Sequence, residues 1–500
     1  NSLTGTLLYI LNIVIMFIMS PVIVHSLGNR DYGLWELVMS VVGYMGLLDL
    51  GIGPALLRYV AIAHSKNDQE ELQKIISTAQ SFFVAIGILA ALAMLAISYN
   101  PALITGEKAP DSNYLTTVFL LFALNAGMSF PLGVFTAVLM GVQRHYLVDS
   151  VRIVLGVVRA VIAYILLTSY LGKGLLILAI LELIFNVIQF SLFYVALRRD
   201  ETIPTIRLSA CSWIKFKELF SYGSKSAMLM VASRVQNSSL PFVINATLGV
   251  STIVYFTMPN RLVDYAKGLS LAMGFPLTPY FAAQLGDDNS NLKSSWLQTS
   301  LAFQIVTLAM PIYILFCGET FLTLWIGKEY AVAGRGVLYF LSVALFVEAL
   351  APNANRLLLA SGRHGRAAIA WLVLSVVSIP LAVFGARQWG ITGVALGSTL
   401  SLITGTIITL HMACRDVGVS MITYLHATTF RLIIPLSLLG LSLWLFGNLS
   451  LTSSYLLLIF KVLFSAVVYL LSVWFLTIDV GNRRRISEKI ILLWKKEHMA

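Results

Sequence analysis

The sequence predicts an all-α integral membrane protein with about fourteen transmembrane helices, forming two pseudo-symmetric six-helix lobes and a C-terminal helix pair. Three observations lead to this fold class. First, 58% of the 500 residues are hydrophobic and only 11% are charged, whereas soluble domains carry about 25% charged residues. Second, the apolar residues fall into runs of membrane length. Third, residues of the first half recur in the second half at a nearly constant offset.

The apolar runs are long enough to cross a bilayer, which takes roughly 20 residues of helix. Because lipid offers the backbone no hydrogen-bond partner, each run must satisfy its own amide and carbonyl groups as a helix. We expect fourteen such helices, at residues 3–27, 33–62, 74–98, 114–140, 152–171, 174–197, 219–248, 250–283, 294–318, 336–360, 367–386, 391–414, 426–447 and 453–476.

A diverged internal repeat groups these helices. Leu27-Gly28 recurs 221 residues later as Leu248-Gly249, and Gly141 and Gly362 have the same separation. Each copy holds six helices, an even number, so both copies have one orientation and would be related by an axis along the membrane normal. We therefore divide the chain into an N-terminal six-helix lobe (1–197), a cytoplasmic linker (198–218), a C-terminal six-helix lobe (219–414), helices 13 and 14 (415–476) and a basic cytoplasmic tail (477–500).

The net charge of +11 is distributed unevenly between the two sides of the expected membrane. With the N-terminus inside, the cytoplasmic loops and the tail hold 19 of the 34 Lys and Arg residues, and the opposite side holds six. Such a bias sets orientation, so we expect both termini in the cytoplasm. The basic tail is explained by orientation and by contact with anionic lipid, and we expect no nucleic-acid partner.

One stretch, residues 27–74, resembles a known family. Its apolar run contains Glu36, Asp49 and Arg58, charges that are costly in a membrane. Tyr32-Gly33, Asp49-Leu50-Gly51-Ile52 and Ala55-Leu56-Leu57-Arg58 together resemble the start of Wzx-type O-antigen or polysaccharide flippases. These form the polysaccharide transporter branch of the multidrug/oligosaccharidyl-lipid/polysaccharide exporter superfamily.

The resemblance implies a fold like that of MATE transporters, with a cavity between the lobes, in the bacterial inner membrane. It implies that the substrate is an undecaprenyl-pyrophosphate-linked oligosaccharide, such as an O-antigen repeat unit. The protein would move it from the cytoplasmic to the periplasmic leaflet by alternating access. Candidate partners are the surrounding membrane lipid and a polysaccharide polymerase. Because one chain would form the whole cavity, we expect a monomer.

Several polar residues lie deep in the expected helices and gather on single helix faces, as in helices that line a wet cavity. The deep cations favour a pyrophosphate, because a guanidinium fork matches phosphate oxygens; they are Arg58, Arg159, Arg234, Arg261, Lys267 and Arg356. Deep amides could hydrogen-bond sugars, and the candidates are Asn186, Gln189, Asn237, Asn245 and Asn355.

Each of these charges also has a plain structural interpretation. Arg58 lies near a predicted cytoplasmic end and could extend its side chain to the interface. Asp49 lies beside Gly51 and Gly53, which indicate tight packing or a bend. We expect Asp264 to pair with Arg261 and Lys267, each one helical turn away, which would still leave helix 8 with net positive charge.

The sequence contains no GxxxxGK[ST] motif, so we expect no ATP hydrolysis by this chain. The three cysteines are scattered, and we expect no metal site and no cofactor. Transport would then depend on a gradient of H⁺ or Na⁺, or on consumption of the product. The candidate residues for ion coupling are Asp49, Glu182, Asp264 and Glu348.

Three alternatives remain open. A MATE-type multidrug exporter would carry acidic residues deep in its first lobe, but the first predicted helix has no Asp or Glu and the deep charges are mainly positive. A lipid II flippase also has fourteen helices and a cationic cavity, although the motif from Asp49 to Arg58 resembles the polysaccharide branch more. A membrane-embedded glycosyltransferase or polymerase would carry long loops, which this chain lacks. We therefore expect a transporter rather than an enzyme.

Overall fold

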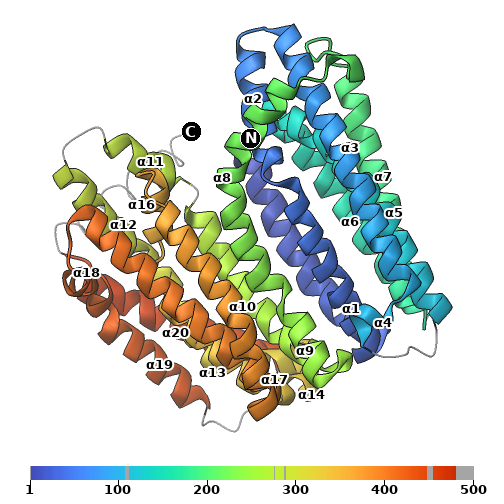
Figure 1. The fold of residues 1–500 in the computed structure, drawn as a ribbon. Coiled ribbons are helices and arrows are strands. Elements are labelled where there is room, and N and C mark those ends of the chain that lie inside the picture. Colours follow the sequence, from blue (N-terminus) through green and yellow to red (C-terminus); the bar gives the residue numbers. More distant parts are fainter. Residues whose placement is uncertain are drawn as a thin grey trace, which may run out of the picture. The chain divides into compact units, whose positions relative to one another are not determined.

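The computed structural model describes residues 2–106, 112–170, 172–274, 276–285, 289–447 and 454–479, and over these ranges its regular elements are all helices. The chain forms two compact units (Figure 1). Unit 1 comprises residues 1–254 and 371–394, and unit 2 comprises residues 255–370 and 395–500. The lobe boundaries expected from the sequence stay a prediction, and residues 480–500 of the expected basic tail lie outside the described ranges.

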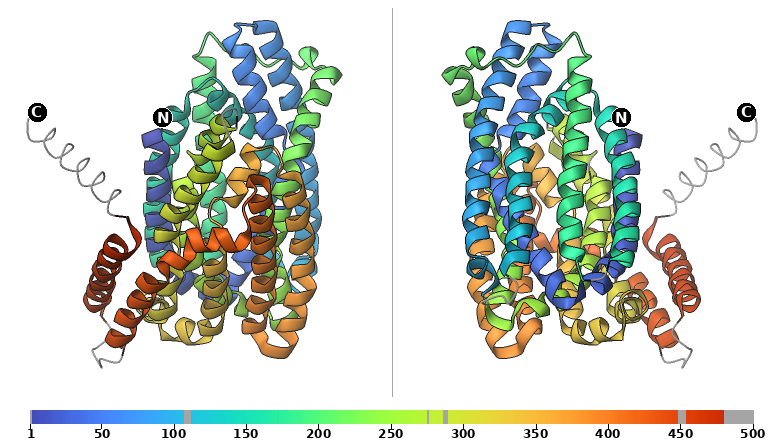
Figure 2. Two further views of the ribbon diagram at one scale, coloured as in Figure 1. Left: turned by 90° about the vertical axis from the view of Figure 1, so that its left-hand side faces the viewer. Right: turned by 90° about the vertical axis from the view of Figure 1, so that its right-hand side faces the viewer.

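Unit 1 is built from long helices that lie side by side (Figures 1 and 2). The helix α3 packs against α5, α5 packs against α7, and α1 packs against α6. In chain order the elements are α1 (Ser2–Met45), the 3₁₀ turn η1 (Gly46–Asp49), α2 (Ile52–Ser65), α3 (Gln69–Tyr99), α4 (Ala102–Thr105), α5 (Ser112–Gly141), α6 (His145–Ser169), α7 (Gly174–Arg198), η2 (Leu208–Ala210), α8 (Trp213–Ser238), α9 (Leu240–Leu248) and η3 (Val250–Thr252).

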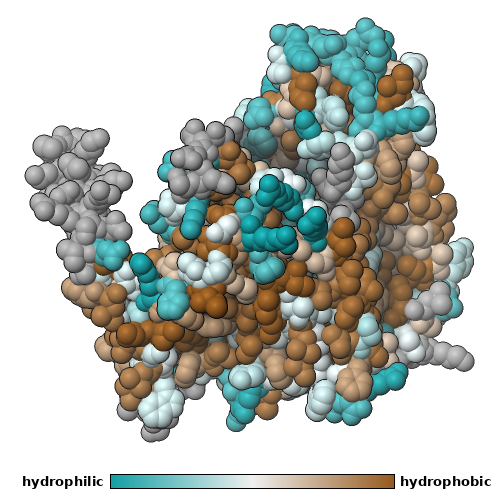
Figure 3. Space-filling view, turned by 60° about the vertical axis from the view of Figure 1, so that its left-hand side comes forward, coloured by the Kyte–Doolittle hydropathy of each residue, from teal (hydrophilic) through white to brown (hydrophobic). Residues whose placement is uncertain are grey.

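Local sequence explains where α3 begins. The Asp68 side chain accepts a hydrogen bond of 2.9 Å from the backbone N–H of Glu71 and so caps the helix. Two glutamates in the first turn, Glu70 and Glu71, favour the same end because they lie at the positive end of the helix dipole. Figure 3 shows hydrophilic side chains around the turn between α2 and α3 and apolar ones along the flanks of the helices, the pattern of membrane-spanning segments.

Unit 2 has shorter and more broken helices around two buried apolar clusters. The C-terminal helices α19 and α20 pack against each other and against α13. In chain order the elements are α10 (Ile253–Gly274), α11 (Leu277–Gln284), α12 (Asn289–Thr307), α13 (Ala309–Trp325), α14 (Lys328–Ala333), α15 (Arg335–Ala349), α16 (Ala354–Ala360), α17 (Gly365–Val417, shared with unit 1), α18 (Met421–Ala427), η4 (Thr429–Leu432), α19 (Ile433–Gly447), α20 (Tyr455–Ser472) and the π turn η5 (Val473–Thr477).

Among the described residues, nine helices are long and apolar enough to cross a membrane, or ten if the bent pair α15 and α16 is one span. The expected total of fourteen therefore stays a prediction. Two differences have a plain cause. The α17 helix joins two expected spans across a kink at Trp389-Gly390. The α1 helix joins the expected span 3–27 to the first part of 33–62 across a kink at Gly28, and the rest of 33–62 is broken off by η1 and continues as α2. The expected spans 219–248 and 250–283 correspond to α8 to α11, which do not meet the criterion because they are more polar or interrupted.

Two glycines matched by the sequence repeat have similar backbone angles. Gly28 and Gly249, which are 221 residues apart, have φ angles of 72° and 91° and interrupt their helices at equivalent points. Gly172 and Gly390 likewise have φ angles of 87° and 59°. Only glycine adopts these angles without steric cost, so both copies retain glycine where the chain turns.

The sequence aligns Gly141 with Gly362, but the backbone angles place the equivalent residue of the first copy two positions later. Gly362 has φ of 70°, whereas the left-handed residue in the first copy is Gln143, with φ of 64°. The turn geometry therefore aligns Gln143-Arg144-His145 with Gly362-Arg363-His364, two residues away from the alignment by glycines.

The arginine of each turn makes an ion pair with an aspartate near the end of the sixth expected helix of its own copy, Asp200 just after α7 and Asp416 in the last turn of α17. Arg144 Nη2 lies 2.6 Å from Asp200 Oδ2, and Arg363 pairs with Asp416 through Nη1 and Oδ1. Both aspartate side chains are almost enclosed, with 4% and 8% of their surface exposed. We call these pairs the Arg–Asp clasps. Each clasp is made within a single unit.

Candidate functional site

The break between α1 and α2 positions the first group of expected site residues. Leu50 and Gly51 have φ angles of 51° and 77°, which end η1 and allow α2 to begin in a new direction. The Asp49 carboxylate accepts a hydrogen bond of 2.7 Å from the backbone N–H of Gly53. Asp49 therefore caps α2, a structural task that is compatible with the packing interpretation of this residue.

A backbone crossing between α2 and α8 presents Arg58. A Cβ atom added to Gly51 would lie 2.1 Å from the carbonyl oxygen of Gly223, so the two helices touch without side chains between them. Beside this crossing, the Arg58 guanidinium carbon lies 4.4 Å from the centroid of the Tyr222 ring, a cation–π contact. Among the described residues no carboxylate forms an ion pair with Arg58, so its charge is held by an aromatic face alone.

Arg234 on α8 lies against α1 and η1. Its guanidinium would be 3.7 Å from a Cβ on Gly43 and 3.8 Å from a Cβ on Gly46, which is ordinary van der Waals contact, so it lies against both glycines. Nearby, the hydroxyl of Tyr44 on α1 shares a hydrogen bond with that of Ser239, the residue between α8 and α9. Arg234 is exposed and has no ion pair or hydrogen bond over the ranges that the structure describes. Its donors are available to an anion.

The two asparagines predicted for this part of the chain differ in their contacts. Asn237 donates from Nδ2 to Ser233 Oγ over 3.4 Å, a long contact within α8, and its side chain is exposed. Asn245 donates from Nδ2 to the carbonyl oxygen of Ile104 over 2.8 Å and so ties α9 to α4. Asn237 has donors to offer a ligand, whereas one Asn245 donor is committed to the fold.

The pair α6 and α7 holds a compensated charge. Arg159 Nη1 lies 2.6 Å from Glu182 Oε2, with 44% and 28% of the two side chains exposed. One turn further along α7, Asn186 donates to Asn125 of α5 over 2.8 Å. Gln189 is half-buried on the same helix. The expected cation Arg159 and the expected coupling residue Glu182 thus neutralise each other.

In unit 2 a second compensated pair involves α10. Lys267 Nζ lies 3.0 Å from Glu348 Oε2 and 3.3 Å from Glu348 Oε1, on α15. Asp264 accepts a hydrogen bond of 2.8 Å from Asn260. We expected Lys267 to pair with Asp264, one turn away, but its ion pair is with a residue 81 positions later in the chain. Helix packing, rather than sequence spacing, selects the partner.

The remaining expected residues also lie in unit 2. Arg356 Nη2 donates to the carbonyl oxygen of Leu271 over 3.0 Å, and a Cβ on Gly274 would lie 2.2 Å from Arg356 Nε. Any side chain at position 274 would therefore clash with the Arg356 guanidinium in this position. Asn355 is exposed on α16, and Arg261 is half-buried on α10.

Sequence reasoning missed the neighbours that shape these positions. Tyr222 and Tyr44 were not singled out, and neither were Gly43 and Gly46, whose three-residue spacing on one helix face is a signal for close approach of another group. Among the described residues no group of three His, Cys, Asp or Glu could hold a metal ion.

Sequence comparison connects the first half of the chain to one family. The family model described as "Polysaccharide biosynthesis protein" matches residues 1–284. A Shigella flexneri protein named "Putative O-antigen transporter" is 22% identical over 394 residues, which is 77% of this chain and 90% of that protein. The "Uncharacterized membrane protein EpsK" of Bacillus subtilis (strain 168) is 22% identical over 411 residues, covering 79% of this chain and 78% of that protein.

Structural comparison shows the fold. The structure titled "Lipid II flippase MurJ, inward closed conformation" matches with a TM-score of 0.72 at 14% identity, covering 95% of this chain and 98% of that one. An inward-facing multidrug resistance MATE family transporter matches with a TM-score of 0.69 at 17% identity, covering 82% and 94%. The MATE-like architecture expected from the sequence is confirmed.

Proposed function

Because this chain belongs to the polysaccharide biosynthesis protein family, within the multidrug/oligosaccharidyl-lipid/polysaccharide exporter superfamily, we propose that it is a flippase for undecaprenyl-pyrophosphate-linked oligosaccharides. It moves an O-antigen or similar repeat unit from the cytoplasmic to the periplasmic leaflet of the bacterial inner membrane. The name of the Shigella flexneri relative supports this substrate class, and the family supports transport rather than catalysis.

The observation that carries the proposal is the uncompensated charge of Arg234. Its guanidinium lies against Gly43 and Gly46, and the described residues supply no carboxylate to it. A pyrophosphate offers the paired oxygens that a guanidinium fork binds best. Arg58, held on the Tyr222 ring, is a second such cation in the same unit. Exposed Asn237 supplies a hydrogen-bond donor for a sugar.

The remaining features of the transport cycle follow as parts of the same proposal. Alternating access occurs through a cationic cavity between the lobes, and both termini lie in the cytoplasm. A proton or Na⁺ couples through Asp49, Glu182, Asp264 or Glu348. Glu182 and Glu348 act through their ion pairs, because protonating either carboxylate would release Arg159 or Lys267. The protein works as a monomer next to a polysaccharide polymerase.

The test is complementation of a strain that lacks its own O-antigen flippase and therefore lacks surface polysaccharide. The unaltered chain should restore the polysaccharide, and Arg234→Ala should not, although the variant reaches the membrane in normal amounts. Arg387→Ala is the matched control, since Arg387 is exposed and was not assigned to the site. Full rescue by an Arg58→Ala, Arg234→Ala double variant would rule out the cationic site.

A second strain separates the proposal from the lipid II alternative. In cells depleted of their lipid II flippase, this chain should fail to sustain growth while it restores surface polysaccharide in the first strain. The opposite result would reassign the substrate to lipid II, whose flippase shares the fold.

A further inference from the structure

The segment that connects α7 to α8 is held against α3 by hydrogen bonds. Gln69 and Gln73, one turn apart on α3, donate to the carbonyl oxygens of Thr202 and Thr205 over 3.0 and 2.9 Å. The next turn continues the series, because Ser77 Oγ accepts a hydrogen bond of 3.1 Å from the backbone N–H of Arg207. One polar face of α3 thus holds residues 202–207 in an extended path.

The two ends of this segment are held as well. At its beginning, Asp200 is held by the Arg–Asp clasp and accepts hydrogen bonds from the backbone and hydroxyl of Thr202, at 3.1 and 2.6 Å. At its end, Lys215 Nζ lies 2.5 Å from Glu71 and 2.9 Å from Glu218. The hydrogen bond to Glu71, followed by that to Glu218, raises the pKa of Lys215, so the ammonium stays charged. The segment is therefore fixed along its whole length and can form one wall of a pocket.

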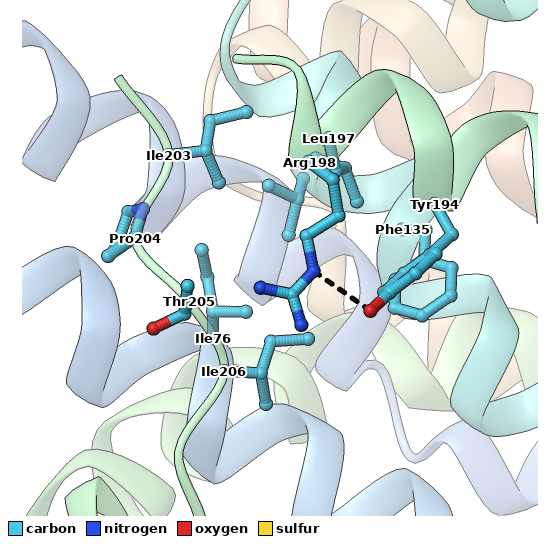
Figure 4. A pocket seen from close by; sticks show the side chains of 10 residues that line it. Ile76, Phe135, Tyr194, Leu197, Arg198, Ile203, Pro204, Thr205 and Ile206 are labelled. Atoms are coloured by element: carbon cyan, nitrogen blue, oxygen red, sulfur yellow. Dashed lines mark hydrogen bonds between the residues drawn. The ribbon is translucent and has the colours of Figure 1, made fainter. Parts of the chain in front are cut away.

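Behind this wall lies an apolar pocket of about 80 Å³ (Figure 4). Ile203, Pro204 and Ile206 of the connecting segment form one side of it. Three helices supply the rest through Ile76 of α3, Phe135 and Val138 of α5, and Tyr194 and Leu197 of α7. The volume is roughly half that of the ~150 Å³ cavity that binds benzene. It suits a few carbons of one hydrocarbon chain.

A single cation lines the pocket. Arg198 Nε donates to Tyr194 Oη over 2.8 Å, and its guanidinium carbon lies 5.1 Å from the Tyr194 ring centroid. Figure 4 shows the guanidinium between this ring and the side chains of Thr205 and Ile206. No carboxylate forms an ion pair with Arg198 among the described residues, and Asp200, two residues later, pairs with Arg144. Both Nη groups are therefore available to an anion.

The place of Arg198 in the chain identifies the kind of anion. It is the last residue of α7, one of the helices that are apolar and long enough to span the membrane. A tyrosine and an arginine at such an end mark the level where hydrocarbon meets the lipid headgroups. An anion that meets Arg198 there while an apolar group enters the pocket must be an amphiphile.

We propose that this pocket, roofed by residues 203–206, is a binding site for one anionic phospholipid. Its phosphate contacts the Arg198 guanidinium, and the first carbons of one acyl chain, next to the headgroup, enter the apolar space. A free phosphate would leave the apolar lining unfilled, and a neutral alkane would leave the guanidinium unpaired. The site is separate from the Arg234 position proposed for the substrate.

The experiment uses the full-length protein, purified in detergent and titrated with phosphatidylglycerol or phosphatidylcholine, with bound lipid counted by native mass spectrometry. One phosphatidylglycerol should be retained about tenfold more tightly than phosphatidylcholine, because the choline ammonium repels the Arg198 guanidinium and offsets the charge of the phosphate. Arg198→Gln should remove that preference. Arg199→Gln, an equal charge change at the neighbouring exposed residue, should retain it. Ile203→Trp should lower retention of phosphatidylglycerol by filling the pocket.

Three results would overturn the proposal. One is equal retention of both lipids by the unaltered protein. Another is loss of the preference in Arg199→Gln together with its survival in Arg198→Gln. The third is tight binding of undecaprenyl phosphate but not of phosphatidylglycerol, which would assign the pocket to the carrier lipid. Because Arg198 is exposed, its substitution leaves the apolar core intact, and the test does not depend on the folding of Ile203→Trp.

Discussion

Two neighbouring parts of unit 1 each contain an arginine, but only one of the two arginines has a carboxylate partner among the described residues. Between α6 and α7, Arg159 lies 2.6 Å from a glutamate. Between α1 and α8, Arg234 lies against two glycines and has no carboxylate partner among the described residues. A charge in a membrane helix must be compensated by something, because its transfer into hydrocarbon is costly. The comparison shows that Arg159 is satisfied within the fold, whereas Arg234 depends on water or on a ligand.

The difference should be largest in transport. Arg234→Ala removes the uncompensated guanidinium and should lower the rate of polysaccharide export by at least about tenfold, the loss expected for a hydrogen bond to a charged group. Arg234→Lys should retain part of the activity, because it keeps the charge but loses the fork. Export is measured as surface polysaccharide against the amount of protein in the membrane. Equal export by the alanine and lysine variants would show that charge at this position is unimportant.

The glycines around the uncompensated site should affect stability. Gly51→Ala places a Cβ 2.1 Å from the Gly223 oxygen and forces the residue to keep a positive φ. Overpacking of this kind costs roughly 1–3 kcal/mol, and the purified variant should unfold at a lower temperature. Gly133→Ala is the control, since nothing lies within 4 Å of its added Cβ in α5. A Gly51→Ala variant as stable as this control would refute the close crossing of α2 and α8.

The ion pair between Arg159 and Glu182 should show energetic coupling between its two residues. Glu182→Gln leaves Arg159 unbalanced and should reduce the amount of folded protein in the membrane, and Arg159→Gln should do the same. The double variant should recover most of this loss, with a coupling energy of about 0.5–3 kcal/mol between the two positions. Additive losses measured by thermal unfolding would mean that the 2.6 Å contact contributes nothing.

The two Arg–Asp clasps should differ from each other, because both aspartates are almost enclosed while the two arginines are exposed to different extents. Arg144→Ala leaves the almost enclosed Asp200 carboxylate without its ion pair and should cost about 1–3 kcal/mol, and Arg363→Ala should cost less, because 39% of the Arg144 side chain is exposed against 71% of Arg363. Both losses should shrink in high salt, since screening weakens exposed pairs. Unfolding of the purified variants at two salt concentrations measures this. A larger loss at Arg363 would reverse the ranking.

Much of the fold was predictable because it depends on local chemistry. Apolar runs predict spans, and the paired glycines Gly28 and Gly249 predict equivalent breaks in the two copies. Charge partners were less predictable, because they depend on which helices meet. Asp264 is three residues from Lys267, yet Lys267 pairs with Glu348 on another helix. Helices α8 to α11 are not identified as spans by their length and mean hydropathy. The polar residues that suggest a function there also lower the mean hydropathy.

The way the connecting segment is fixed has one practical consequence. Its Cys211 Sγ lies 2.9 Å from Ser81 Oγ of α3, and of the three cysteines in the chain it is exposed while Cys317 and Cys414 are buried. A maleimide dye should therefore label this segment of the natural sequence at one position. The emission of such a dye would report, in real time and without engineering, whether the segment stays on α3 or lifts away.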